Sequence, residues 1–159
     1  MESEQLIKAF TATVQASLHG LQSLEPVLQR EQRGLTGNDP VHLEQVVKEK
    51  LALLKQLEHS VLARDRLQKA AGLAEGMEAG GRLVEALKHP QLAADWATMT
   101  ALVQHVADLN DQNGQLALQG QRATRTALGI LTGRDEKEDT YSTLRRRTGG
   151  VASYSLGKV

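Results

Sequence analysis

The chain has 159 residues, 19 acidic and 19 basic side chains, and no cysteine. Its balanced charge creates no overall field that would attract nucleic acid or an anionic membrane, and its partner is expected to be protein. The lack of cysteine excludes disulfides, thiolate metal sites and a cysteine nucleophile. With only one Phe, one Trp and two Tyr, the core must be built mainly from Leu, Ala and Val. This composition favours an all-α fold of long helices over a sheet.

The first segment predicts a long helix with a narrow apolar seam. Five apolar residues lie seven positions apart along it: Ile7, Val14, Leu21, Leu28 and Leu35. Ser3 is the candidate cap at its start, and Pro26 predicts a kink or a break near residues 22–25, because proline removes an intrahelical donor. A helix over residues 3–35 would be roughly 50 Å long, which favours an elongated bundle or coiled coil.

A short turn over residues 36–40 separates this helix from a second one. Gly37 suits a left-handed C-terminal cap, Asp39 an N-cap, and Pro40 the first helical position. Because the link is short, the second helix should run antiparallel to the first. Its apolar stripe consists of Leu43, Val47, Leu51, Leu54, Leu57, Val61 and Leu62. The charged residues between Lys48 and Glu58 are interpreted mostly as solvated flanks.

Glycines accumulate over residues 70–81, where regular helix should weaken, and a short helix around Leu83, Val84 and Leu87 follows. A final long helix is predicted over residues 90–133. Its apolar positions are Leu92, Trp96, Met99, Val103, Val106 and Leu109. The seam then turns polar at Asn110 and Asn113. Two interpretations stay open: these residues pair buried polar groups and fix the register, or they face a partner.

The last stretch, over residues 134–159, is rich in charge, glycine and serine and contains both tyrosines. Such a segment cannot bury enough apolar surface to offset its ordering entropy, although Tyr141, Leu144, Tyr154 and Leu156 could anchor it on a partner. The sequence thus predicts two parts: a helical bundle domain over residues 1–133 and a flexible C-terminal substrate-binding tail over residues 134–159.

No residue pattern indicates catalysis, a cofactor or a metal. The five histidines are scattered without metal-ligand spacing, and no glycine-rich phosphate loop follows a strand. Three consecutive arginines at 145–147 are too small a basic patch to predict nucleic-acid binding. The first residues do not resemble a signal peptide, and no apolar run approaches the roughly 20 residues that span a bilayer. We expect a cytoplasmic protein without membrane insertion.

Several motifs occur in an order that resembles the FlgN family of flagellar export chaperones. They are Leu-Asn-Asp-Gln-Asn-Gly at 109–114, Ala-Leu-Gly-Ile-Leu-Thr-Gly at 127–133, Thr-Tyr at 140–141, the Leu-, Lys- and Glu-rich stretch 46–58, and Ser-Leu-Gly-Lys-Val at 155–159. The resemblance covers most of the chain and is weakest over the glycine-rich middle. One departure is that the family commonly has a glycine a few residues after the tyrosine. Here Tyr141 is followed by Ser-Thr-Leu and three arginines.

The resemblance implies a chaperone that binds hook-filament junction proteins, prevents their premature assembly and delivers them to the flagellar type III export gate. It implies no catalysis. Substrate recognition would fall on the C-terminal part, with the region around Tyr141 and Leu144 meeting the export machinery. The expected partner-binding residues are Asn110, Asn113, Gly114, Leu128, Leu131, Tyr141, Leu144, Tyr154 and Leu156.

A second hypothesis is a structural coiled-coil adaptor whose apolar seams are used in self-association and whose tail is only a linker. The sequence does not decide between a monomer and a weak homo-oligomer. It also does not decide which junction protein would be preferred.

Overall fold

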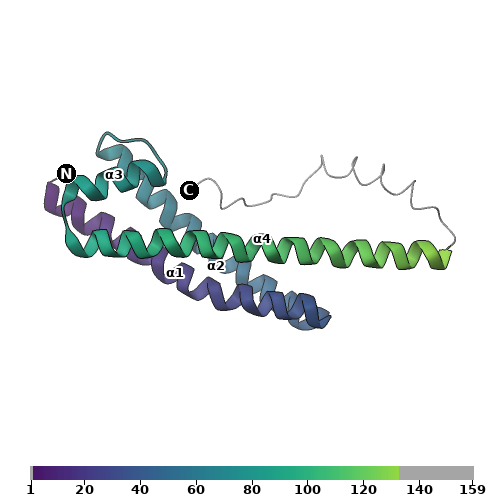
Figure 1. The fold of residues 1–159 in the computed structure, drawn as a ribbon. Coiled ribbons are helices and arrows are strands. Elements are labelled where there is room, and N and C mark those ends of the chain that lie inside the picture. The colour runs from purple at the N-terminus through teal and green to yellow at the C-terminus, as the bar shows by residue number, and fades with distance from the viewer. Residues whose placement is uncertain (1, 133–159) are drawn as a thin grey trace.

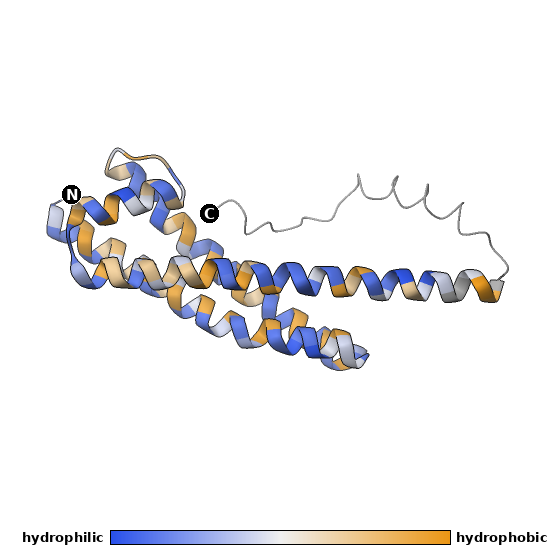
Figure 2. Cartoon of the chain, in the orientation of Figure 1, coloured by the Kyte–Doolittle hydropathy of each residue, from blue (hydrophilic) through white to orange (hydrophobic). Residues whose placement is uncertain are grey.

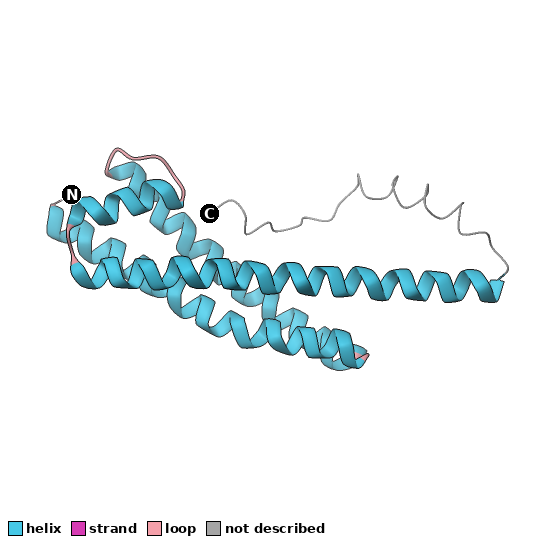
Figure 3. Cartoon of the chain, in the orientation of Figure 1, coloured by secondary structure: helices cyan, strands magenta, loops and turns pink. Residues whose placement is uncertain are grey.

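The computed structural model describes residues 2–132, which form four helices joined by short links (Figures 1 and 3). The helices are α1 (Ser3–Gly37), α2 (Pro40–Ala70), α3 (Met77–Leu87) and α4 (Pro90–Thr132). No strand occurs between residues 2 and 132. The prediction of an all-α fold with three long helices and a short one is confirmed. The predicted tail lies outside the described residues.

Helix α1 is the shared element of the bundle. Helices α2 and α4 each pack along it, while α3 contacts α2 and α4 at the end where α1 begins (Figure 1). Fully buried apolar side chains line these contacts, among them Phe10, Val14, Leu24, Leu28, Leu92, Met99 and Val106. None of the described helices is long and apolar enough to cross a membrane.

The turn between α1 and α2 follows the predicted chemistry with one shift. Asn38, and not Gly37, adopts the left-handed conformation with φ of 53°, because α1 continues through Gly37. Asparagine tolerates this region better than most side chains. The Asp39 carboxylate accepts a hydrogen bond from the backbone N–H of His42 at 3.2 Å, and Pro40 is the first residue of α2. The predicted cap and start of α2 are therefore confirmed.

One prediction for α1 is narrowed and another is wrong. Of the kink or break expected near Pro26, the break does not occur, because the helix runs through Pro26 continuously. Ser3 is its first helical residue and not its cap, because Glu2 holds the cap position in an extended conformation without a side-chain hydrogen bond.

The glycine-rich stretch divides into a loop and a helix. Gly72 and Gly76 lie in the loop at φ of 79° and 96°, where a side chain would be strained. The Gln68 side chain secures this loop by donating to the Ala74 carbonyl at 2.9 Å and the Gly76 carbonyl at 3.0 Å. Gly80 and Gly81, in contrast, lie inside α3. The expected weakening of regular helix is thus confined to residues 71–76.

Trp96 joins all four helices where α3 packs. Its ring stacks on Phe10 of α1 at a centroid distance of 6.0 Å, and the Arg64 guanidinium of α2 lies 5.8 Å from its centroid. Arg64 is 1% exposed and donates to the Met77 sulfur at 3.0 Å. On the α3 side the indole meets Gly80, where an added Cβ would lie 2.4 Å from Trp96 Cη2. Gly80 is therefore required by packing and not by backbone conformation.

Replacing Gly80 by alanine should destabilise the bundle by about 1–3 kcal/mol, the usual cost of overpacking, because the rigid indole cannot easily move away. Gly81→Ala is the matched control, since its nearest contact is Trp96 Nε1 at 3.6 Å. It should leave stability unchanged or raise it by up to about 1 kcal/mol through helix propensity. Urea unfolding followed by circular dichroism measures both. Equal midpoints for the two variants would contradict the packing role of Gly80.

Candidate partner-binding surface

Asn113 of α4 forms hydrogen bonds to α1 near the middle of the helix. This side chain is 2% exposed, and its Nδ2 donates to the Leu28 carbonyl and to Glu31 Oε1, both at 2.8 Å. The Glu31 carboxylate also accepts from Lys50 Nζ of α2 at 3.1 and 3.2 Å. Asn113, Glu31 and Lys50, here called the three-helix clasp, thus connect α4, α1 and α2 through one carboxylate.

The clasp keeps an ionised group satisfied away from water. Glu31 is 6% exposed, and the Lys50 side chain is 18% exposed. A buried carboxylate is costly unless an opposite charge and hydrogen-bond donors compensate its lost hydration. Lys50 supplies the charge and Asn113 an additional donor. The geometry therefore selects one register of α4 against α1.

A second ion pair joins α1 to α2 near the clasp. The Arg30 guanidinium donates to both carboxylate oxygens of Glu49. This hydrogen bond, assisted by the charge of Arg30, holds the pKa of Glu49 below its ordinary value and raises the pKa of Arg30. The pair therefore stabilises the α1–α2 hairpin at neutral pH, and its contribution is lost as the pH falls through the lowered pKa of Glu49.

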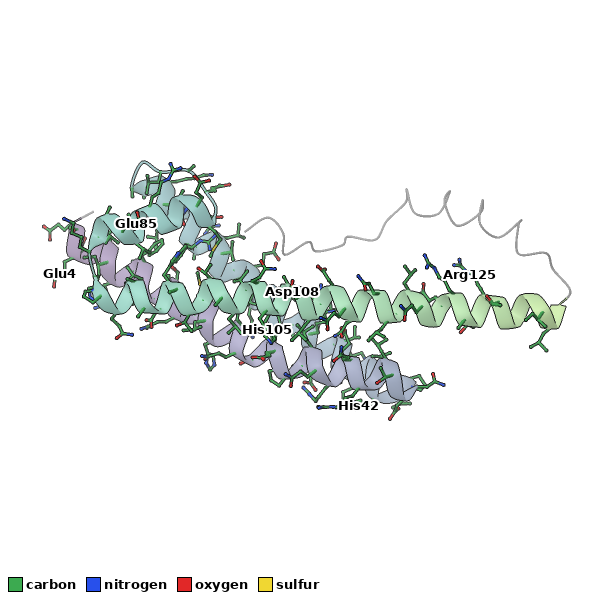
Figure 4. All side chains as sticks on the ribbon, in the orientation of Figure 1. Glu4, His42, Glu85, His105, Asp108 and Arg125 are labelled. Atoms are coloured by element: carbon green, nitrogen blue, oxygen red, sulfur yellow. The ribbon has the colours of Figure 1, made fainter. Side chains whose placement is uncertain are left out.

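Beyond the clasp, α4 continues as a single helix. Residues 114–132, here called the projecting half, extend roughly 28 Å at 1.5 Å per residue. They extend away from the α1–α2 hairpin, with Arg125 on this part and His105 and Asp108 near the crossing with α1 (Figure 4). None of its described side chains is buried. Leu118 is 38% exposed, Ile130 77% and Leu131 80%.

The projecting half differs in character from the part of α4 that packs in the bundle. It shows mainly hydrophilic residues interrupted by isolated hydrophobic ones, with hydrophobic residues again at its tip (Figure 2). An added Cβ at Gly114 or Gly120 would meet no atom within 4 Å, so tight packing does not require either glycine. A helix that exposes large apolar side chains without neighbours has a surface available to a partner.

The structure separates the predicted partner-binding residues into three groups. Asn113 is buried and hydrogen-bonded in the bundle, which agrees with the interpretation that it pairs buried polar groups. Asn110 is half-buried beside it, and Gly114 is exposed. Leu131 stands at the tip of the projecting half; Leu128 belongs to the same helix, although its side chain is not among those described. Tyr141, Leu144, Tyr154 and Leu156 lie outside the described residues. A role in partner binding stays a prediction for the whole set.

Sequence reasoning missed Glu31 and Lys50, whose roles the structure shows. Glu31 stands between Leu28 and Leu35 on the apolar seam of α1, and Lys50 lies between Val46 and Leu57 on the buried side of α2. Opposite charges inside two apolar seams were the available signal. Lys50 was instead interpreted as a solvated flank.

No group of three or more His, Asp or Glu side chains that could hold a metal ion occurs within residues 2–132. The projecting half is mainly hydrophilic but exposes Leu118, Ile130 and Leu131, which suits contact with another polypeptide (Figure 2).

Replacing Asn113 by alanine should lower the free energy of unfolding by about 1–3 kcal/mol, because a buried carboxylate and a buried carbonyl each lose a donor. Asn110→Ala is the control on the same helix, and it should cost less because the structure shows no side-chain hydrogen bond for it. Thermal and urea unfolding measure the difference. If both variants lost the same stability, the clasp would not be the reason for the polar seam.

Comparison with known proteins identifies the family. A family model described as FlgN protein matches residues 1–145. The chain belongs to the FlgN family. A crystal structure at 1.48 Å resolution, described as a flagella synthesis protein FlgN from Pseudomonas aeruginosa, has the same fold as this FlgN-family chain. The TM-score between the two is 0.55. The two are 24% identical, and the match covers 82% of this chain and 98% of the other. No curated protein matches the chain.

Family membership supports a flagellar chaperone role in general terms and confirms the resemblance that the motifs indicated. In this FlgN-family chain, the α1–α2 hairpin holds the first half of α4 and leaves the second half projecting.

Proposed function

We propose that this FlgN-family chain is a cytoplasmic export chaperone. It binds hook-filament junction proteins, prevents their premature assembly and delivers them to the flagellar type III export gate. The observation that carries the proposal is the projecting half of α4, which exposes Leu118, Ile130 and Leu131 away from the bundle. Subunits that assemble through amphipathic helices offer complementary apolar surface while they are unassembled.

The energetics suit a binding helix that is already formed. Fully burying a side chain such as Ile130 or Leu131 is worth about 1.5–3 kcal/mol. The bundle anchors the helix at Asn113, so the projecting half does not bear the cost of nucleating a helix in isolation. The helix is therefore already ordered before the partner binds, and less conformational entropy is lost on association.

In this proposal the tail extends the same surface. Tyr141 and Leu144, and further on Tyr154 and Leu156, are the residues that could anchor it on a junction protein or on the export gate. A segment that orders only on its partner binds with a lower net affinity, which suits a cargo that must be released. The missing glycine after Tyr141 would change how this region approaches the gate.

Removing residues 134–159 should leave helicity and melting temperature nearly unchanged and abolish binding to hook-filament junction proteins. The physical reason is that the charged, glycine- and serine-rich tail offers too little apolar surface to offset its ordering entropy, so it should add little to the stability of the bundle. Calorimetric titration of the truncated and complete chains with purified junction proteins measures the loss. Undiminished affinity after truncation would refute the role of the tail, and the double variant Tyr141→Ala, Leu144→Ala locates it more finely.

Leu131→Lys should weaken the binding of a junction protein about tenfold or more, since an apolar anchor would be replaced by a charge that must be desolvated. Val41→Lys is the matched control, because Val41 is 79% exposed and lies on α2, next to the turn that joins α1 to α2 and not on the projecting half. Native mass spectrometry of the same samples tests the adaptor hypothesis. A stable homo-oligomer that ignores junction proteins would contradict the chaperone proposal, whereas one-to-one complexes would support it.

A further inference from the structure

Gly114 is a residue that the fold itself does not require. It lies inside α4 directly after Asn113, and its φ is not positive. An added Cβ at this position would meet no atom of the described residues within 4 Å. Glycine also destabilises the interior of a helix relative to alanine. Neither packing nor backbone conformation therefore accounts for glycine at this position.

The residue that Gly114 affects chemically is the one before it. Asparagine is among the chemically labile residues of proteins. In an Asn-Gly pair the backbone nitrogen of the glycine attacks the side-chain amide carbon most readily, because glycine has no Cβ to obstruct the approach and its backbone turns freely. Asn113-Gly114 is the only such pair in the sequence, whereas Asn110 is followed by Asp111. The side chain that joins α4 to α1 thus stands in a reactive sequence context.

We infer that Asn113 is a deamidation site, which the three-helix clasp protects and whose reaction irreversibly releases α4 from its register on α1. The Gly114 nitrogen forms a bond to Cγ of Asn113, and the bond from Cγ to Nδ2 breaks. The proton of the attacking nitrogen leaves with the amide group as ammonia. Water then opens the resulting succinimide ring at either of its carbonyl carbons. The product is aspartate or isoaspartate, in which the main chain runs through the former side chain.

Two sets of hydrogen bonds keep the pair unreactive in the folded chain. Asn113 Nδ2 donates to the Leu28 carbonyl and to Glu31 Oε1, both at 2.8 Å, which holds the side-chain amide against α1. In an α-helix the Gly114 N–H is directed along the axis toward the carbonyl of Asn110. The reaction therefore needs α4 to open locally at the clasp. Opening can start from the projecting half, because none of its described side chains is buried.

Deamidation would reverse the role of position 113 in the clasp. A carboxylate has no hydrogen to donate at neutral pH, so it would face the Leu28 carbonyl and the Glu31 carboxylate with acceptors only. Lys50 would then be the one cation of the clasp for two carboxylates, and a buried carboxylate without compensation is costly. Isoaspartate would also lengthen the main chain where the projecting half begins. Loss of ammonia makes the change irreversible.

This inference concerns the free chain and does not depend on the proposed function. The two are connected in one respect. A junction protein bound to the projecting half would suppress local opening of α4, and the reaction at Asn113 would slow. A chaperone without cargo would therefore lose its clasp sooner than a loaded one.

Incubation of the complete chain at neutral pH, followed by peptide mapping with mass spectrometry, measures aspartate and isoaspartate at position 113. Glu31→Ala should deamidate there at least about tenfold faster than the unmodified chain, because Asn113 loses its charged acceptor. Glu25→Ala is the matched control, since it removes the contact between Glu25 and His105 that also joins α1 to α4 outside the clasp. It should leave the rate nearly unchanged.

A synthetic peptide of residues 106–120 gives the rate without the fold and should react fastest. Equal rates in the peptide and the complete chain would overturn the protective role of the clasp. No reaction in either would overturn the site itself. Equal acceleration by Glu31→Ala and Glu25→Ala would also contradict the inference. Circular dichroism shows whether each variant remains folded at the incubation temperature.

Two further variants test the inference even if Glu31→Ala does not fold. Gly114→Ala should deamidate at least about tenfold more slowly and melt no lower than the unmodified chain, because alanine obstructs the attacking nitrogen and favours the helix. An unchanged rate would overturn the role of Gly114. Asn113→Asp should unfold at a lower urea concentration than Asn113→Ala, since both lose the donor and only aspartate adds a charge. Equal midpoints would overturn the proposed release of α4.

Discussion

The Asn113 amide joins α4 to α1 by donating to a backbone carbonyl and a carboxylate that are both shielded from water. Water cannot replace Asn113 as the donor to either acceptor. This contact therefore holds α4 at a defined register against α1. Beyond Asn113, none of the described side chains of α4 is buried. The projecting half therefore begins where the buried face of α4 no longer packs on α1.

The two ends of the bundle are held together by different kinds of interaction. Where α3 packs, Trp96, Phe10 and Arg64 fill the core and Gly80 allows close approach, so the helices are held by dense packing. At the clasp, an ion pair and hydrogen bonds hold the helices together. They fix the register of α4 more than they add to the free energy of unfolding. The first arrangement suits a scaffold. The second suits the boundary between a scaffold and a binding arm.

Much of this fold could be predicted from the sequence because helical periodicity and capping chemistry act locally. The seven-residue spacing of apolar residues from Ile7 to Leu35 predicted α1. Asp39 and Pro40 predicted where α2 begins. The contact between Gly80 and Trp96 was not predictable, since nothing local distinguishes a glycine that breaks a helix from one that admits an indole. The Glu31–Lys50 pair was also missed, because its two residues lie on different helices and only their juxtaposition gives them a role. The shift from Gly37 to Asn38 reflects one further residue of α1.

Hydrogen exchange along α4, read by mass spectrometry, tests the central claim that Asn113 marks the boundary between scaffold and binding arm. In the free chain, amide protection should be high up to Asn113 and fall steeply over residues 114–132. Adding a purified hook-filament junction protein should raise protection over residues 114–132 and leave the first half of α4 nearly unchanged. Equal protection of both halves in the free chain, or no gain over residues 114–132 at saturating junction protein, would contradict the account.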